Sequence, residues 1–319
     1  MIEDRRSARF AVKWAVKAVT PPILVLAAKV VLVRLGLLRP APPPAPESAP
    51  TTPGRPEWEY VPEGWERQRR DPSVRGWDVD AIVEAYRAKW PSFLHALEGA
   101  RPLGVNHEVP VGEEIVTDDL AAHNMLVSFA YALALAAHRK ERVSMLDWGG
   151  GIGHYYEIAK AILPGVEIDY HCRDLPRLAV AGRALHPGAT FSDDDSCLDR
   201  RYDLVLASSS LQYSEEWRET LRRLAGATGG FLYVARVPVA LQSPSFVVLQ
   251  AAYAYGYETE YLSWVLNREE LLSTASASGL ELVREFLLMA WLSAAGAPEV
   301  PTGHRGFLFR QGADAPASS

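Results

Sequence analysis

Four glycines and an acid lie close together near the middle of the sequence, and their types and spacing are suited to holding a ligand. They form the pattern D-x-G-x-G-x-G, with the acid at Asp147 and the glycines at Gly149, Gly150, Gly151 and Gly153. Glycine permits positive φ and lets a ligand approach the backbone, while the free N–H groups opening a helix favour an anionic group. The pattern predicts a small-molecule site on a strand, a tight turn and a helix.

The spacing of the glycines bears on which ligand the turn holds. A dinucleotide fingerprint has the pattern G-x-G-x-x-G, so its sixth position must be glycine. If the fingerprint starts at Gly149, that position is His154, and if it starts at Gly151, it is Tyr156. An NAD(P)-dependent oxidoreductase also needs a catalytic Tyr/Lys or similar pair, which the sequence does not present. A turn that only packs a helix on a sheet is disfavoured too, because four glycines and a strand-end acid exceed what packing requires.

The pattern resembles motif I of the class I S-adenosylmethionine-dependent methyltransferases. In that family the loop wraps the methionine end of the cofactor. The resemblance implies S-adenosyl-L-methionine as cofactor, with Asp147 and the four glycines among the residues that bind it. A non-catalytic scaffold that keeps this fold as a docking domain is the alternative.

The elements around the turn alternate between strand and helix. An apolar run reaches Asp147, and further strands are expected over 166–172, 190–192, 202–208, 231–239, 280–288 and 306–310, with helices over 175–185 and 267–279. This alternation predicts a Rossmann-like α/β fold with a mostly parallel, seven-stranded sheet. In open sheets of this kind, ligands bind outside the carboxyl ends of the strands.

Two acids beyond the turn are predicted to contact the cofactor. Asp174 follows the strand 166–172, where an acid can accept both ribose hydroxyls; it can also cap the next helix, and Asp169 is its rival at mid-strand. Asp194, in the acidic stretch 193–195, is predicted to accept from the adenine amino group. An acidic loop in water is the alternative for that stretch.

The ends of the fourth and fifth strands supply further binding residues. Ser208 and Gln212 are predicted to contact the cofactor, and Arg236 the substrate. A tyrosine-rich insertion at 240–266 follows and includes Tyr257, which is also assigned to the substrate. We interpret the insertion as a lid or substrate wall, with a dimer surface as the alternative.

A hydroxyl acceptor benefits from a general base, and histidine has the pKa nearest to neutrality. The catalytic candidates are His123, His154 and Tyr213, although the sequence favours a packing role for His123 and a loop-shaping role for His154. His107 and Glu108 lie in a loop-like stretch that could face a substrate. The favoured interpretation is that these two are polar residues of a surface loop that contact water.

The chain divides into five stretches by composition. A basic, amphipathic helical segment spans 1–39, a proline-rich linker 40–56, a helical cap that could contact substrate 57–141, the cofactor-binding domain 142–311, and a loose tail 312–319. The apolar part of the first segment is broken by Pro21 and Pro22 and by charged residues. Its uninterrupted apolar run is therefore shorter than the ~20 residues that a membrane-spanning helix needs.

The first segment is compatible with two roles. It is interpreted as an interfacial anchor attracted to anionic lipid on the cytoplasmic leaflet, or as a helix that packs on the domain or on a partner. The whole chain of 319 residues has a net charge of -6, which provides no basic field for nucleic acid. Its two cysteines lack metal-ligand spacing and suit a reducing cytoplasm, and no metal site is predicted.

Several segments in order resemble one family of bacterial methyltransferases. They are 147–153, 174–176, 207–213, 236–238 and 267–270, within a similarity that runs from about 21–24 to the last strand. Members of that family are often associated with surface-polysaccharide or glycolipid biosynthesis. The resemblance therefore implies a small-molecule, glycan or glycolipid acceptor, methylated on a hydroxyl or an amine.

Overall fold

The computed structural model describes residues 57–289 and 294–312. The predicted amphipathic segment 1–39, the linker 40–56 and all but the first residue of the predicted tail lie outside the described residues.

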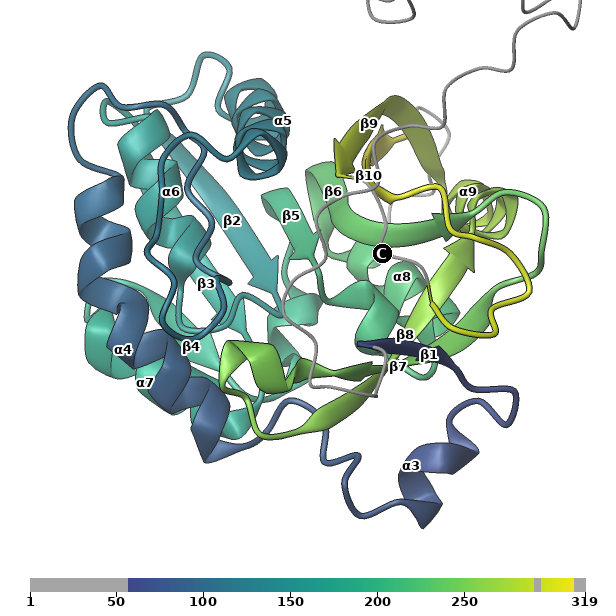
Figure 1. Cartoon of the computed structure of the whole chain (residues 1–319). Helices are drawn as coiled ribbons and strands as arrows, with labels where there is room; N and C mark the ends of the chain where they lie inside the picture. Colours follow the sequence, from purple (N-terminus) through teal and green to yellow (C-terminus); the bar gives the residue numbers. More distant parts are fainter. Residues whose placement is uncertain (1–56, 290–293, 313–319) are drawn as a thin grey trace, which may run out of the picture. The chain divides into compact units, whose positions relative to one another are not determined.

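A ten-stranded sheet forms the centre of the described chain, three strands more than predicted, and seven of its strands make up the Rossmann-like part (Figure 1). In spatial order these seven strands are β4 (Thr190–Ser192), β3 (Glu167–Arg173), β2 (Arg142–Trp148), β5 (Tyr202–Ser208), β6 (Thr228–Ala240), β10 (His304–Gln311) and β9 (Leu280–Met289). The first five pair in parallel, and β10 runs antiparallel between β6 and β9. The predicted mostly parallel α/β sheet is confirmed.

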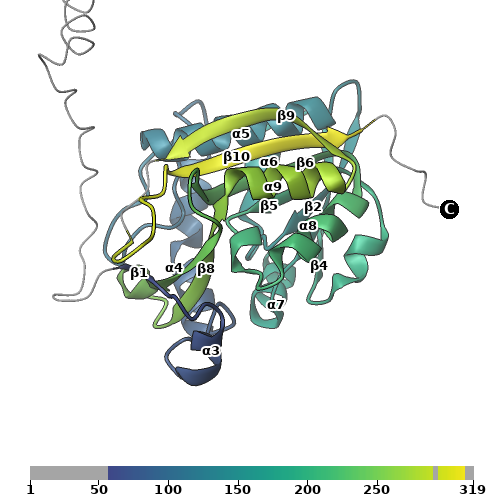
Figure 2. The same ribbon diagram turned by 90° about the vertical axis from the view of Figure 1, so that its right-hand side faces the viewer.

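Helices cover both faces of the sheet, because successive strand residues point to opposite sides. Leu204 and Leu206 pack in one core, whereas Val205 and Ala207 pack in the other. The first core includes residues of α4 (Asp80–Ala96), α5 (Leu120–Ala136), α6 (His154–Ile162) and α7 (Pro176–Leu185); the second includes α8 (Trp217–Gly226) and α9 (Arg268–Ala277). Figure 2 shows α8 and α9 on the side nearer the viewer.

Local signals place the helix starts. Asn267 caps α9 by accepting from the Glu270 N–H at 3.0 Å, as its spacing from Glu270 predicts. Asp119 caps α5 in the same way, through the Ala122 N–H at 2.9 Å. Pro176 occupies the first turn of α7, where its missing N–H costs nothing.

The stretch predicted as an insertion extends the sheet. It forms β7 (Phe246–Ala251), the 3₁₀ turn η3 (Ala252–Tyr255) and β8 (Glu260–Asn267), and β8 pairs in parallel with the end of β6. The stretch predicted as a helical cap contributes β1 (Trp58–Tyr60), which pairs with β7, and the short helix α3 (Glu66–Arg70). Two segments distant in sequence therefore build one antiparallel edge beside the parallel sheet.

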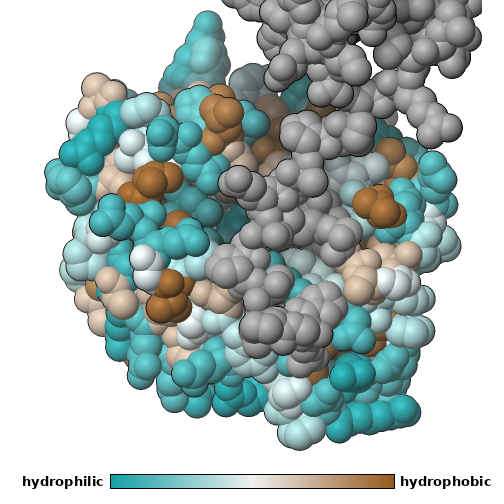
Figure 3. Space-filling model, viewed as in Figure 1, coloured by the Kyte–Doolittle hydropathy of each residue, from teal (hydrophilic) through white to brown (hydrophobic). Residues whose placement is uncertain are grey.

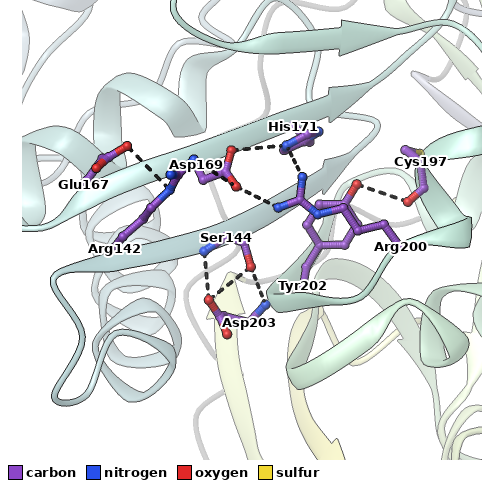
Figure 4. Close-up of polar contacts among 9 residues, drawn as sticks. All are labelled: Arg142, Ser144, Glu167, Asp169, His171, Cys197, Arg200, Tyr202 and Asp203. Atoms are coloured by element: carbon purple, nitrogen blue, oxygen red, sulfur yellow. Dashed lines mark hydrogen bonds and ion pairs between the residues drawn. The ribbon is translucent and has the colours of Figure 1, made fainter.

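A polar network ties β2, β3 and β5 together toward their amino ends (Figure 4). The Asp203 carboxylate accepts from the Ser144 N–H at 2.9 Å and the Ser144 hydroxyl at 3.0 Å. On β3, Asp169 accepts from Arg200 at 2.7 Å and contacts His171 at 3.2 Å. These contacts hold the strands in register at the edge away from the glycine turn.

The face seen in Figure 3 is mostly hydrophilic, with separate hydrophobic patches among the described residues. Within the described ranges, no helix combines the length and the apolar character needed to cross a bilayer.

Candidate functional site

A cavity of about 340 Å³ opens at the carboxyl ends of the parallel strands. This is the edge where the sequence predicts the ligand. The predicted site residues that line it are Gly149, Gly150, Gly151, His154, Asp174, Ser208, Tyr213 and Arg236. Its volume lies in the range of small-molecule pockets, roughly 300 to 1,000 Å³.

The glycines of the turn serve different purposes. A Cβ at Gly149 would meet the Ser210 Cβ at 2.3 Å, and one at Gly150 would meet the Asp147 carboxylate at 2.4 Å. A Cβ at Gly153 would meet the His186 ring at 2.8 Å. Packing therefore does require three of the four, contrary to the expectation from the sequence. Gly151 differs, because a Cβ there would lie no closer than 3.4 Å to any other atom, the nearest being in the Tyr86 ring that lines the cavity.

Asp147 lies beneath the turn and does not line the cavity. It is fully buried, and its Oδ2 accepts from the Tyr170 hydroxyl at 2.6 Å while Oδ1 has no partner among the described residues. Burial raises its pKa to about 7, against the lowering effect of the Tyr170 hydrogen bond. The Asp147 carboxyl group lies close to the turn at Gly150, where a Cβ would meet it.

Asp174 lies on the cavity wall beside Gly151. Its Oδ2 accepts from the Gly151 N–H at 2.6 Å and its Oδ1 from the Leu175 N–H at 2.6 Å. Burial raises the pKa of this carboxyl, although both backbone hydrogen bonds oppose the effect. The rival, Asp169, lies outside the lining and is held by Arg200.

Gly153 and three further predicted residues also lie outside the cavity lining. His123 is half-buried in the first turn of α5. Asp194 is exposed and caps the 3₁₀ turn η1 (Asp195–Asp199) through the Ser196 N–H at 2.9 Å. Tyr257 is buried behind the lining, with its ring edge-on to Tyr86 at 5.9 Å.

Gln212 lies in the 3₁₀ turn η2 (Leu211–Tyr213), behind the cavity wall. Its side chain is buried and donates to the Arg236 carbonyl at 3.1 Å and to the Ser209 hydroxyl at 3.3 Å. It therefore contacts the backbone that presents Arg236, and it is absent from the cavity lining.

The favoured interpretation of His107 and Glu108 as polar residues of a surface loop is wrong, because both line the cavity. The His107 ring stacks on His154 with centroids 3.9 Å apart and an interplanar angle of 21°. Burial, with Arg236 and Lys89 nearby, lowers the pKa of His107 to about 3. Burial, with His107 nearby, also lowers the pKa of His154 well below its ordinary value. Both rings are neutral at pH 7.

Arg236 is presented by an irregularity in β6. Ala235 and Arg236 stand opposite Gly306 of β10, and Arg236 has a φ of 57°. Such a bulge redirects a side chain, and positive φ at a bulky residue is characteristic of functional sites. Arg236 forms a half-buried ion pair with Glu108. Although burial opposes it, Glu108 raises the pKa of Arg236 further, so the guanidinium stays charged.

Aromatic side chains make up a further part of the lining. Trp77 stacks on Tyr261 with centroids 4.3 Å apart, and it lies 4.9 Å from the Tyr213 ring. Tyr86 also lines the cavity. The sequence does not assign Trp77 or Tyr86 to the site, whereas Tyr261 lies in the stretch 240–266 that we interpret from the sequence as a lid or substrate wall. Their only signal was the concentration of aromatics in the two stretches that flank the parallel sheet.

Comparisons with known proteins give likenesses of fold. No family model and no curated protein sequence matches the chain. Among solved structures, a methyltransferase from Clostridium acetobutylicum ATCC 824 is similar at 11% identity, covering 59% of this chain and 90% of its own, with a TM-score of 0.39. Magnesium protoporphyrin IX methyltransferase from Synechocystis PCC 6803 is similar at 11% identity, covering 70% and 94%, with a TM-score of 0.40.

A third solved structure, 1,6-didemethyltoxoflavin-N1-methyltransferase from Burkholderia thailandensis, is similar at 16% identity, covering 64% of this chain and 94% of its own, with a TM-score of 0.39. The strand order and the antiparallel β10 define the architecture independently. The described part of the chain has a Rossmann-like α/β fold, whose parallel strands are flanked by helices on both faces.

Proposed function

We propose that the protein is an S-adenosylmethionine-dependent methyltransferase that methylates an oxygen or nitrogen of a small-molecule acceptor. One observation carries the proposal: the glycine turn and Asp174 line the same cavity as Tyr213, Arg236 and His107. A cofactor on the first group of residues and an acceptor on the second would share one enclosed space.

The residues present fit the cofactor. Gly151 has no side chain where its backbone meets the cavity, which leaves room for close approach. Each oxygen of Asp174 accepts one backbone N–H, so a free lone pair remains on each for a ligand hydroxyl. Trp148 and Leu178 add flat and apolar lining on the same cavity.

The cofactor, when bound, supplies a methyl group already activated by a positive sulfonium. The chain then has to hold the acceptor in line and exclude water. The Tyr213 hydroxyl can donate to the acceptor, because burial and Glu108 raise its pKa to about 12 and keep it protonated. His107 and His154, neutral and stacked, provide a fixed wall beside the acceptor.

Two finer proposals rest on the sequence. The resemblance to a polysaccharide-associated family implies a glycan or glycolipid acceptor, yet no contact among the described residues selects a sugar over another ring. The amphipathic segment 1–39 is proposed to hold the protein on the cytoplasmic face of a membrane.

Calorimetry tests the cofactor assignment. We expect the full chain to bind S-adenosylmethionine and its demethylated product but not NAD, and Asp174→Asn to weaken binding about tenfold because hydrogen bonds to a charged group are worth roughly 1.5 to 3 kcal/mol. Asp199→Asn, which alters an exposed carboxylate outside the lining, should bind as the wild type does. A preference for NAD would end the proposal, and binding of none of the three would favour a scaffold.

A screen of labelled methyl transfer identifies the acceptor. Lipid-linked sugars, nucleotide-linked sugars and phenols should be offered side by side to the full chain. Transfer to any of them that Asp174→Asn reduces would support the activity.

A further inference from the structure

We propose that the acceptor is a phenol, whose ring lies against Trp77, Tyr213 and Tyr261 and whose ionised oxygen is bound by the Arg236 guanidinium. This inference rests on the proposed function and narrows its acceptor to one chemical class. It departs from the glycan class that the sequence resemblance implies.

The guanidinium of Arg236 has hydrogen-bond donors at the cavity that no described residue uses. It carries five N–H groups, and its one hydrogen bond to the described residues goes from Nη2 to Oε2 of Glu108. The side chain is 15% exposed and lines the cavity. Donors on a charged, largely buried group are best satisfied by an anionic oxygen. The bulge at Arg236 holds them at the cavity wall.

The neighbouring aromatic rings suit a flat acceptor. Trp77, Tyr213 and Tyr261 all line the cavity, and Tyr213 meets Tyr261 edge-on with centroids 5.3 Å apart. An aromatic acceptor can stack on or abut such rings at a gain of about 0.5 to 1.5 kcal/mol beyond its burial. The Arg236 side chain lines the same cavity as these rings, so its charged donors face the space that a flat acceptor would occupy.

The groups around Arg236 leave no strong base for an aliphatic hydroxyl. The titratable groups that interact with it are Glu108, Tyr86, Tyr155, Tyr213, Tyr255, His107, His154 and His304. Burial is the chief cause that lowers the pKa of His107 and of His304 to about 3 and raises that of Tyr213 to about 12. Glu108 is already paired with Arg236. A bound phenol would differ from Tyr213, whose pKa is raised by burial and which makes no hydrogen bond to the Arg236 guanidinium among the described residues. Hydrogen bonds from the cation directly to the ionised oxygen lower its pKa, so such an acceptor needs no separate base.

The phenol releases its proton to solvent as it binds to Arg236, so the transfer itself involves no proton step. The phenolate oxygen forms the O–CH₃ bond as the S–CH₃ bond breaks, and the electron pair of that bond remains on sulfur. A negative oxygen and a positive sulfur become a neutral ether and a neutral thioether. Arg236 and Glu108 keep their charges throughout.

The test uses para-nitrophenol, whose phenolate absorbs visible light, and the full chain without cofactor. We expect bound para-nitrophenol to ionise at a pH at least about one unit lower than in free solution, because an adjacent cation lowers an acidic pKa by about 1 to 3 units. Para-nitroanisole, which has the same ring but cannot ionise, should bind at least about tenfold more weakly.

Paired variants sharpen the test. Arg236→Gln should abolish the shift, whereas Glu108→Gln should enlarge it, because the cation then lacks its partner. The double variant Arg236→Gln/Glu108→Gln, which leaves no buried charge unpaired, should also lose the shift if Arg236→Gln does not fold. Arg222→Gln, at an exposed site on α8, is the control and should keep it.

Three outcomes would overturn the inference: bound para-nitrophenol that stays neutral, equal binding of para-nitroanisole, or an unchanged shift in a folded variant without Arg236. These results differ from failure of the proposed function, which appears as absent binding of S-adenosylmethionine. Methyl transfer to sugars without phenolate binding would keep the function and remove the phenol.

Discussion

Asp147 shows how a single buried carboxyl can set the pH dependence of stability. Its pKa rises to about 7 from the value of 3.8 expected in the unfolded chain. The folded protein therefore binds more protons than the unfolded chain between these values. The stability from this group is fully present at pH values below about 4 and is lost as pH rises through about 7.

We predict that Asp147→Asn removes this loss. The amide can still accept from the Tyr170 hydroxyl, and it cannot ionise. Urea unfolding at several pH values should show the wild type losing on the order of a few kcal/mol from acidic to mildly alkaline pH, and the variant losing less. The pKa of Asp174 is raised in both proteins. The difference between their pH dependences of stability therefore reports Asp147. Equal losses in both would contradict the assignment.

At the scale of elements, the glycine turn combines two functions that the sequence pattern does not separate. Gly149 allows β2 to approach the loop after β5, where Ser210 donates to the Trp148 carbonyl at 2.7 Å. Gly151 has a φ of 63° and meets the cavity. One glycine supports packing between elements, and the other leaves space for a ligand.

Alanine at each position should separate the two functions. Gly149→Ala should lower the melting temperature strongly, because its Cβ would lie 2.3 Å from the Ser210 Cβ. Gly151→Ala should cost only about 1 to 2 kcal/mol of stability for its left-handed backbone, yet reduce cofactor affinity in calorimetry. Melting curves and titrations on both variants measure the two effects. Unreduced affinity in a folded Gly151→Ala protein would remove the turn from the cofactor site.

At the scale of the whole molecule, residues 1–39 lie outside the described residues and their proposed role needs a direct test. The full chain should sediment with anionic vesicles less as salt increases, because basic residues near an anionic surface contribute about 1 kcal/mol each at low salt. A chain lacking residues 1–39 should stay in the supernatant, as should the full chain with neutral vesicles. Equal sedimentation of both chains would assign the contact elsewhere.

The sequence by itself determined the parallel strands, the helix cap at Asn267 and the turn beside Asp147, although the cap predicted at Asp174 does not form on α7. Each of these depends on local pattern: the apolar strand runs, the cap at Asn267, and the glycines that follow a strand-end acid. Only the tertiary structure brought Glu108 to Arg236 across 128 residues and stacked His107 on His154. These contacts depend on a bulge in β6 and on how the 101–119 loop closes over the sheet edge. Neither the bulge nor the loop closure is a local property of the sequence. The sequence of a polar loop therefore does not show whether its side chains face water or a cavity.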